Sequence, residues 1–303
     1  MENLDNKRKI FLKKFEKRYK KFEKFSKYSG RGFSNRIKRL FYAPHIYIPY
    51  IFHKLLSFKY IKNKTTLFWG KEINFDVNDL DSYFLHLSGL LLGEGKLTKF
   101  FIKTLKGDDV FYDIGANHGF YTYLSLEFCK EVHSFEPLPI VFKPLQKNLV
   151  KTDNVFLNNV AVTNTNKQRN MYLSTSSGTS TINKDVLAFA SCKYSHTIKV
   201  NAITLDEYIS NHSKPTVIKI DIEGSESLLI KGDLQFLKNN SPIIAMEVWS
   251  GDPGKNISMK AVEGLRNLGF QPHCLNTNGE IYKIKRDLSK SSRQCTEMLI
   301  FKK

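Results

Sequence analysis

The sequence predicts an α/β fold in which a mainly parallel sheet is covered by helices on both faces. The first observation is residues 109–119, DVFYDIGANHG, where a short apolar run leads through Asp113 into a turn with Gly115 and Gly119. A run with helical spacing follows at residues 120–128, so the order is strand, glycine turn, helix. The second observation is that strand-like and helix-like runs alternate from residue 109 onward. The third is that polar residues gather where the predicted strands end.

The 303-residue chain is strongly basic, and its charge is unevenly distributed. Its 47 lysines and arginines against 29 acids give a net charge of +18. Residues 1–71 hold 20 basic and 4 acidic residues, which leaves 27 against 25 for the remainder. An anionic partner would therefore bind the amino-terminal part. A uniform nucleic-acid-binding surface is disfavoured for the main domain.

Four widely spaced cysteines, Cys129, Cys192, Cys274 and Cys295, show no CxxC pair and no metal-ligand pattern. A disulfide framework is unusual at this size, so we expect a reducing cytoplasm. We expect no signal peptide and no spanning helix, because the most apolar early run, residues 41–56, is interrupted by prolines, histidines and a lysine. The expectation is a cytoplasmic protein, soluble or peripheral on the inner membrane face.

Residues 1–64 are expected to form a basic, aromatic-rich helical extension. Within it, residues 7–27 have the period of an amphipathic helix with an aromatic stripe on a lysine-rich surface. The stripe consists of Phe11, Phe15, Tyr19, Phe22 and Phe25. Three interpretations stay open: contact with an anionic membrane surface, packing on the protein's own body, and contact with RNA.

Residues 65–108 are expected to cover one end of the sheet. Residues 65–75 alternate like a strand pair that turns at Gly70 and Lys71. Residues 80–105 have a helical period that is broken near residues 93–95.

The main domain, residues 109–303, is predicted to contain seven strands, with one late strand antiparallel. After the glycine turn, strands are expected at residues 131–135, 155–162, 217–222, 242–248, 270–275 and 297–301. Helices are expected at residues 141–150, 225–238 and 257–268, and a further helix opens at Thr204. Strand-like runs at 170–173 and 197–203 flank a small, polar run at 174–181, which we interpret as a mobile loop bordering the acceptor site.

Polar side chains at the carboxyl ends of these strands predict one ligand site, since ligands of open α/β sheets bind there. In chain order the ends carry Asp113, Gly115, Asn117, His118, Glu136, Asn159, Ala161, Asp221, Glu223 and Glu247. Glu136 follows the glycines by about 20 residues, the distance at which an acid meets a ribose diol in βαβ nucleotide sites.

The charge of the turn distinguishes two nucleotide ligands. A dinucleotide turn needs a third glycine where this chain has Asn117, and Asp113 would face the pyrophosphate. A carboxylate is unfavourable beside a pyrophosphate but favourable beside a sulfonium and an amino group. The turn therefore favours S-adenosylmethionine.

These segments resemble a known family. DIGANHGFY, SFEP, NVAV, IKIDIEGSE and IIAME are similar to the FkbM family of S-adenosylmethionine-dependent methyltransferases, over about residues 109–250. The resemblance implies a class I methyltransferase sheet with a Rossmann-like arrangement, preceded here by the basic extension. It also implies O-methylation, often of sugar hydroxyls in glycosides or surface polysaccharides, so the expected partner is a carbohydrate or glycolipid acceptor.

The resemblance also implies roles for individual positions. Asp113, Gly115, Ala116, Asn117 and Gly119 would form the methionine-side pocket. Glu136 would hold the ribose hydroxyls, with Ala161 against the adenine and Asn159 a further contact. Asp221 and Glu223 would face the acceptor, with Glu247 behind them.

Methyl transfer to an alcohol benefits from a base that removes the hydroxyl proton. We expect Asp221 to be that base, with His118 as the second candidate and Glu223 as a third catalytic candidate. Each has a structural alternative: His118 lines the pocket, Asp221 orients the cofactor's amino group, and Glu223 caps its own helix. Lys219 shares a sheet face with Asp221 and is expected to pair with an acid of the cluster.

A divalent cation bound by Asp221 and Glu247 is possible but not favoured, because the ligand set is incomplete. Two other function classes are weighed against the methyltransferase of sugars. An RNA or DNA methyltransferase is disfavoured because the fourth strand ends in DIEG and no Pro-Cys pair occurs. A non-catalytic nucleotide-binding protein is disfavoured by the intact set of acids. The acceptor and the oligomeric state stay open.

Overall fold

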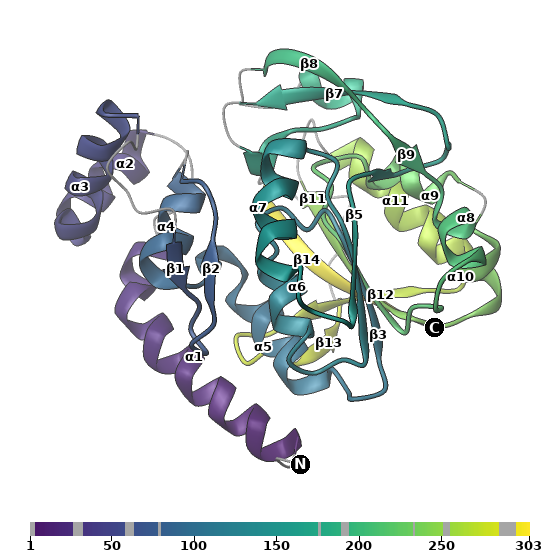
Figure 1. The fold of residues 1–303 in the computed structure, drawn as a ribbon, viewed down its shortest axis with the longest axis horizontal. Coiled ribbons are helices and arrows are strands. Elements are labelled where there is room, and N and C mark those ends of the chain that lie inside the picture. Colours follow the sequence, from purple (N-terminus) through teal and green to yellow (C-terminus); the bar gives the residue numbers. More distant parts are fainter. Residues whose placement is uncertain are drawn as a thin grey trace. The chain divides into compact units, whose positions relative to one another are not determined.

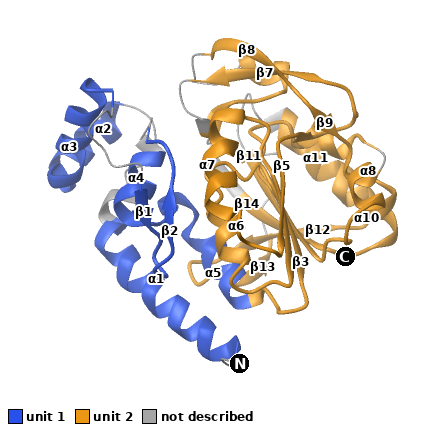
Figure 2. Cartoon of the chain, in the orientation of Figure 1, with its two compact units in different colours: residues 1–103 blue, residues 104–303 orange. Residues whose placement is uncertain are grey.

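The computed structural model of the chain describes residues 4–26, 33–57, 64–77, 80–174, 177–188, 194–232, 234–250, 255–284 and 295–303. They form two compact units, residues 1–103 and 104–303, which Figure 2 colours separately. The two segments expected ahead of the main domain, 1–64 and 65–108, fall largely in the first unit. None of the described helices is long and apolar enough to cross a membrane.

Unit 1 is helical with one small strand pair. Its elements in chain order are α1 (Leu4–Ser26), α2 (Phe33–Tyr42), α3 (Pro44–Leu55), β1 (Lys64–Thr66), β2 (Glu72–Asn74), α4 (Leu80–Ser88), a 3₁₀ turn (Leu92–Glu94) and α5 (Gly95–Thr104). Strands β1 and β2 are antiparallel, as the alternation of residues 65–75 predicts. The predicted break in the helical run near residues 93–95 is also confirmed.

The aromatic stripe of α1 packs on unit 1 itself in its described part. Phe15 is fully buried, and Phe11 is buried beside it. The Phe11 ring stacks on Trp69 with centroids 5.9 Å apart, and the Phe15 ring meets Phe68 edge-on at 5.4 Å. Because these rings are removed from solvent, packing on the protein's own body accounts for this part of the stripe. The side chain of Phe25 lies outside the described residues.

Unit 2 is built on an eight-stranded sheet (Figure 1). Its strands are β3 (Val110–Ile114), β4 (Glu131–Phe135), β5 (Val155–Asn158), β10 (Val217–Ile220), β11 (Ile243–Ser250), β12 (Gln271–Leu275), β13 (Ile281–Lys283) and β14 (Cys295–Lys302). The order is β13-β12-β14-β11-β10-β3-β4-β5. Strand β14 runs antiparallel to β11 and β12, so the predicted late antiparallel strand is confirmed. The sheet has one strand more than predicted, the edge strand β13, which pairs antiparallel with β12.

Helices connect the strands of unit 2. They are α6 (Phe120–Ser125), α7 (Pro139–Leu149), α8 (Leu205–Ser210), α9 (Glu226–Ile230), α10 (Gln235–Asn239) and α11 (Lys255–Asn267). Thr204 caps α8, since its side chain accepts a hydrogen bond from the Glu207 N–H at 3.3 Å. The prediction of one helix over residues 225–238 is wrong: the chain forms α9 and α10 with Gly232 between them, and glycine is a poor residue for a helix interior.

The third predicted strand, residues 155–162, is also two elements. Strand β5 ends at Asn158, and β6 (Ala161–Val162) pairs instead with β9 (Ala202–Ile203). The amide of Asn159 causes the departure by donating to the Glu136 and Pro137 carbonyls at 2.8 and 3.1 Å. Strand β7 (Arg169–Ser174) and strand β8 (Tyr194–Val200) form a separate antiparallel pair.

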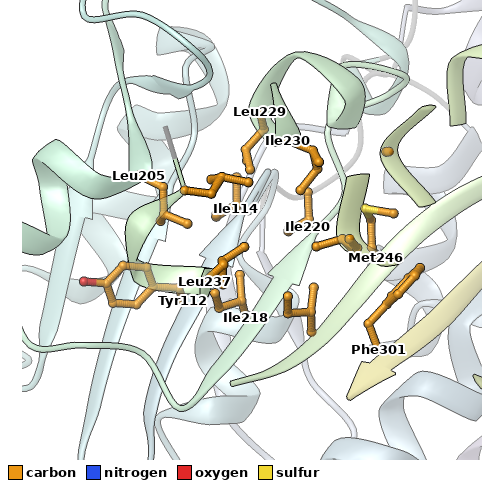
Figure 3. Close-up of a cluster of buried hydrophobic side chains, with 14 of the residues drawn as sticks. Tyr112, Ile114, Leu205, Ile218, Ile220, Leu229, Ile230, Leu237, Met246 and Phe301 are labelled. Atoms are coloured by element: carbon orange, nitrogen blue, oxygen red, sulfur yellow. The ribbon is translucent and has the colours of Figure 1, made fainter. Parts of the chain in front are cut away.

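The main core lies between the sheet and the helices α8 to α11. Figure 3 shows Tyr112 and Ile114 of β3, Ile218 and Ile220 of β10 and Phe301 of β14 in this cluster. Phe111, which precedes Tyr112, is also fully buried. Strand β3 is therefore buried on both faces, which explains why Val110 to Tyr112 form an unbroken apolar run rather than an alternating one.

A buried polar group sits at the edge of this core. His133 of β4 is fully buried; its Nε2 lies 2.5 Å from Glu131 Oε1 and its Nδ1 lies 2.8 Å from the Tyr208 hydroxyl. The Tyr208 hydroxyl also accepts a hydrogen bond from Asn158 Nδ2 at 3.0 Å. Burial lowers the pKa of His133, because the charged imidazolium loses hydration.

The pH dependence of stability follows from that lowered pKa. The unfolded chain binds a proton at His133 near its usual pKa of about 6.5 while the folded chain resists it, so the free energy of unfolding falls as the pH drops from 7.5 to 5.5. His133→Gln, whose amide can donate to Glu131 and accept from Tyr208 without titrating, should flatten this dependence. Urea unfolding at each pH, with hydrogen exchange of β4 peptides as the probe, measures the pH dependence of the free energy of unfolding. His196→Gln, at an exposed position, is the control and should change nothing; an equal slope in His133→Gln and wild type would contradict the assignment.

Candidate functional site

A cavity opens in unit 2 at the carboxyl ends of β3, β4 and β10. It encloses about 650 Å³ of space, a volume that includes open solvent at its mouth. Six of the predicted site residues line it: Gly115, Asn117, Glu136, Ala161, Asp221 and Glu223. The predicted strand ends therefore converge on one site.

The glycine turn after β3 is pressed against the end of β10. Gly115 has a φ of 82°, and a Cβ at this position would lie 1.9 Å from the carbonyl oxygen of Asp221. Only glycine allows this approach. The N–H groups of Gly115 and Ala116 both donate to the Phe135 carbonyl at 3.0 Å, which fixes the turn to the end of β4 as well.

Glu136 is held by the same turn. Its Oε2 accepts a hydrogen bond from the Asn117 N–H at 2.9 Å, and its Oε1 accepts one from the Leu138 N–H at 2.8 Å. The side chain is buried, and burial raises the pKa of Glu136 to about 7 even though both backbone donors favour the charged form. The carboxylate is thus fixed in the cavity wall.

Next to Glu136 the cavity wall is apolar. Phe135, Pro137, Val160, Ala161 and Val162 supply this part of the lining. It has the character of a slot for a flat ring beside a carboxylate. Asn159, predicted as a further contact, donates to the backbone after β4 and shapes this wall rather than lining it.

Asp113 lies beneath the cavity rather than in its wall. The residue is fully buried, and its Oδ2 accepts a hydrogen bond from the Thr122 hydroxyl at 2.7 Å. Burial raises the pKa of Asp113, and the charge of Lys219, 3.7 Å from Oδ1, opposes that rise.

Lys219 connects the two acids at the ends of β3 and β10. Its Nζ lies 3.1 Å from Asp221 Oδ2 and donates to the Gly115 carbonyl at 3.3 Å. The expected pairing of Lys219 with an acid of the cluster is confirmed. The lysine is 3% exposed, so its charge acts in a region of low dielectric constant.

Three carboxylates meet at the part of the cavity wall that Asp221 and Glu223 line, although Glu247 is not itself in the lining. Oxygen atoms of Asp221, Glu223 and Glu247 all lie within 4.8 Å of one another. Burial, followed by the charges of Asp221 and Glu223, raises the pKa of Glu247 well above its usual value. Mg²⁺ is commonly held by one or two carboxylates with waters completing its oxygen shell, but acidic clusters are also common without an ion, so the three carboxylates do not by themselves define a metal site.

The turn that carries Asp221 and Glu223 has strained backbone angles and is held by the side chain of Glu226. Glu223 has a φ of 52°, which is uncommon for a residue other than glycine, and Gly224 follows at 84°. Glu226 holds the turn closed, because its Oε1 accepts a hydrogen bond from the Ile222 N–H at 3.0 Å. Glu226 is buried, and burial raises its pKa to about 7.

Strand β7 and the segment after it contribute lining residues that the strand-end argument misses. Met171, Gly178, Ser180, Thr181 and Ile182 line the cavity. The polar run 174–181 does border the cavity in its described part, whereas residues 175–176 lie outside the described residues. The Thr181 and Ser225 hydroxyls are 3.0 Å apart, and Asn183 Nδ2 donates to the Gly224 carbonyl at 2.6 Å, so this segment is fastened to the turn after β10.

The remaining predicted residues lie beside the cavity. Ala116, His118 and Gly119 belong to the same turn but are not in its lining. A Cβ at Gly119 would lie 2.4 Å from Leu145 Cδ1, so this glycine allows α6 to pack against α7. The packing of these two helices is therefore one reason for a glycine at position 119.

Comparison with known proteins agrees with this geometry. The family described as "Methyltransferase FkbM domain" matches residues 113–272. "Hexuronic acid methyltransferase AglP" from Haloferax volcanii is 28% identical over 176 residues, which span 55% of this chain and 67% of that protein.

Among solved structures, methyltransferase FkbM from Methylobacillus flagellatus is similar with a TM-score of 0.42 and 13% identity, over 75% of this chain and 56% of that chain. A precorrin-6y C5,15-methyltransferase from Geobacter metallireducens has a TM-score of 0.38 and 15% identity, over 70% of this chain and 88% of that chain. Both scores are below 0.5, and the assignment does not rest on them. Because the family match covers more than half of the sequence and contains the described cavity, the chain belongs to the FkbM family of S-adenosylmethionine-dependent methyltransferases.

Proposed function

We propose that this protein transfers the methyl group of S-adenosylmethionine to a hydroxyl group of a sugar. The observation that carries the proposal is the position of Glu136, a carboxylate held by two backbone N–H groups in a cavity wall, next to an apolar slot. A carboxylate so placed accepts hydrogen bonds from the two ribose hydroxyls while the adenine occupies the slot.

The methionine end of the cofactor fits the other side of the cavity. Asn117 lines it, and its buried Oδ1 has no hydrogen-bond partner among the described residues, so it is available to accept from an ammonium group. The acids around the cavity outnumber the one lysine described above, so the site favours a ligand that brings positive charge. S-adenosylmethionine supplies an electrophilic methyl group, which passes to the acceptor oxygen as its bond to the sulfonium sulfur breaks.

Asp221 is the proposed base. Its side chain is 21% exposed in the cavity wall, and Lys219 holds one of its oxygens at 3.1 Å, which fixes the direction of the other. Asp221 would accept the hydroxyl proton as the new carbon–oxygen bond forms. Glu223 lies within reach of the same position and orients the acceptor hydroxyl, whereas His118, outside the lining, remains the second candidate for the base.

The acids also constrain the acceptor. The clustered acids disfavour a further carboxylate, since burial and then the charges of Asp221 and Glu223 raise the pKa of Glu247, whereas a neutral acceptor hydroxyl can donate to them. A sugar acceptor is supported by the relative named as a hexuronic acid methyltransferase. We propose that the sugar belongs to a surface polysaccharide, a glycolipid or a glycosylated metabolite, and that the methylated group is a hydroxyl. Transfer of a radiolabelled methyl group to host glycolipid and polysaccharide fractions, with alkali resistance separating ethers from esters, tests this; label only in base-labile esters or in RNA would overturn it.

Cofactor binding should depend on Glu136 and on pH. Because the pKa of Glu136 is about 7 in the free protein and hydroxyl donors favour the ionised form, affinity for S-adenosylmethionine should rise from pH 6 to 8 and binding at pH 7 should release protons. Glu136→Gln should weaken binding by roughly 10- to 100-fold, the effect of losing a charge-assisted hydrogen bond, and abolish the pH dependence. Calorimetry in buffers of different ionisation enthalpy measures both. Glu263→Gln, an exposed substitution on α11, should bind normally; unchanged affinity in Glu136→Gln would refute the ribose role.

Removal of the base should separate chemistry from binding. Asp221→Asn keeps the size of the side chain and should lower kcat by about 10²- to 10⁴-fold, the usual contribution of a general base. The dissociation constant for S-adenosylmethionine should change by only a few fold. Single-turnover methyl transfer with the fraction identified above, alongside calorimetry, measures the two effects. The opposite pattern, weak cofactor binding with normal turnover once saturated, would make Asp221 an orienting residue for the amino group.

A further inference from the structure

Helices α2 and α3 of unit 1 (labelled in Figure 1) each present an exposed apolar face. On α2 the face consists of Phe33, Ile37, Leu40 and Phe41, and on α3 of Ile48, Ile51, Phe52 and Leu55. These positions follow i, i+4, i+7, i+8 and i, i+3, i+4, i+7, so each set lies along one side of its helix. Phe33, Phe41 and Leu55 are 78%, 81% and 79% exposed. We call these eight residues the α2–α3 face.

The α2–α3 face is not the side by which the helices pack. Ile46, Tyr47 and Tyr50 are buried in unit 1, where the Tyr50 ring lies 5.4 Å from that of Tyr83. Arg39 is also buried and lies over the Tyr47 ring at 5.0 Å. One apolar side of these helices therefore stabilises unit 1 by burial. The other apolar side stays exposed to water and contributes no free energy of burial. Large exposed apolar side chains that share one side of each helix indicate an interaction site.

Charge identifies the partner. Residues 33–55 contain no aspartate or glutamate. Arg36, Lys38 and Lys54 are exposed on the same two helices. Protein interfaces are depleted of lysine at their core, whereas large apolar side chains among cationic ones suit the headgroup region of an anionic bilayer.

The lengths of the helices specify how such a bilayer would be contacted. Helices α2 and α3 have 10 and 12 residues, against the roughly 20 needed to span a membrane. They would lie along the surface with the aromatic and aliphatic side chains below the headgroups and the cations among them.

We propose that the α2–α3 face docks unit 1 on an anionic lipid bilayer. This surface is distinct from the aromatic stripe of α1, whose Phe11 and Phe15 are buried. The proposal rests on unit 1 alone and needs neither the cofactor nor methyl transfer. It would bring the enzyme to lipid-linked sugars, but its failure would leave the methyltransferase proposal unaffected.

Co-sedimentation of the full-length chain with vesicles tests the docking without any methyl donor. The chain should pellet with vesicles of phosphatidylcholine and phosphatidylglycerol at 3:1 in 0.1 M NaCl. It should pellet poorly with phosphatidylcholine alone, and less with the mixed vesicles in 1 M NaCl. The double variant Phe41→Ser, Leu55→Ser should bind at least about tenfold more weakly, as expected when two large apolar side chains are lost from the contact. Neutralising Arg36, Lys38 and Lys54 to glutamine should remove the preference for the anionic lipid.

Matched controls separate docking through the α2–α3 face from non-specific adsorption to the vesicles. Ile140 and Val150 of unit 2 are 62% and 75% exposed, and Ile140→Ser, Val150→Ser should pellet like wild type. Phe52→Trp adds a fluorescence readout that does not depend on sedimentation: the emission should shift to the blue on the mixed vesicles. Absence of pelleting, equal loss in both serine pairs, or a dimer that dissociates on Phe41→Ser, Leu55→Ser without vesicle binding would overturn the proposal, the last outcome identifying a second copy as the partner.

Discussion

The candidate site of unit 2 depends on one buried charged side chain, that of Lys219. The ends of β3 and β10 bring Asp113 and Asp221 to the same place, and Gly115 brings the two chain segments into contact. Burial, and then the nearby charge of Asp221, raise the pKa of Asp113, because both disfavour its charged form. Lys219 lies between the two acids, at 3.7 and 3.1 Å, and also donates to the Gly115 carbonyl. Its charge opposes that rise and holds the two strand ends together at the turn that forms one wall of the cavity.

The sheet could be predicted from the sequence because its strands carry strong local signals. Buried strands such as β3, β10 and β11 are mainly apolar, with one charged residue each, and glycine follows β3 while an acidic residue follows β10. The errors have a common origin in interactions between distant residues. Strand β5 ends early because Asn159 binds the backbone after β4, a contact across 23 residues. Strand β13 is three residues long and depends on β12 for its hydrogen bonds, so its own sequence shows little.

The candidate site was predictable to the same degree. Residues that follow directly on a strand, such as Glu136 and Asp221, could be placed because parallel strands end at a common edge. The order of the residues does not reveal which side chains reach the cavity lining and which are buried behind it. Asp113 is directed below the cavity by its bond with Thr122, nine residues along the chain, and Gly119 is needed for packing against Leu145. Met171 and Ile182 reach the cavity from β7 and the segment after it, which lie outside the main sheet. No periodic pattern in that part of the sequence points to the site.

The segment after β7 has an evolutionary consequence. Part of the cavity lining is formed by β3, β4 and the residues that follow them, whereas another part comes from the segment after β7, which is fastened by the Thr181–Ser225 and Asn183–Gly224 contacts. Substitutions between these contacts can reshape that part of the lining while the strands of the main sheet stay unchanged. If this part of the lining contacts the acceptor, acceptor preference can diverge by exchange of one short segment while the strands that form the rest of the cavity are inherited intact.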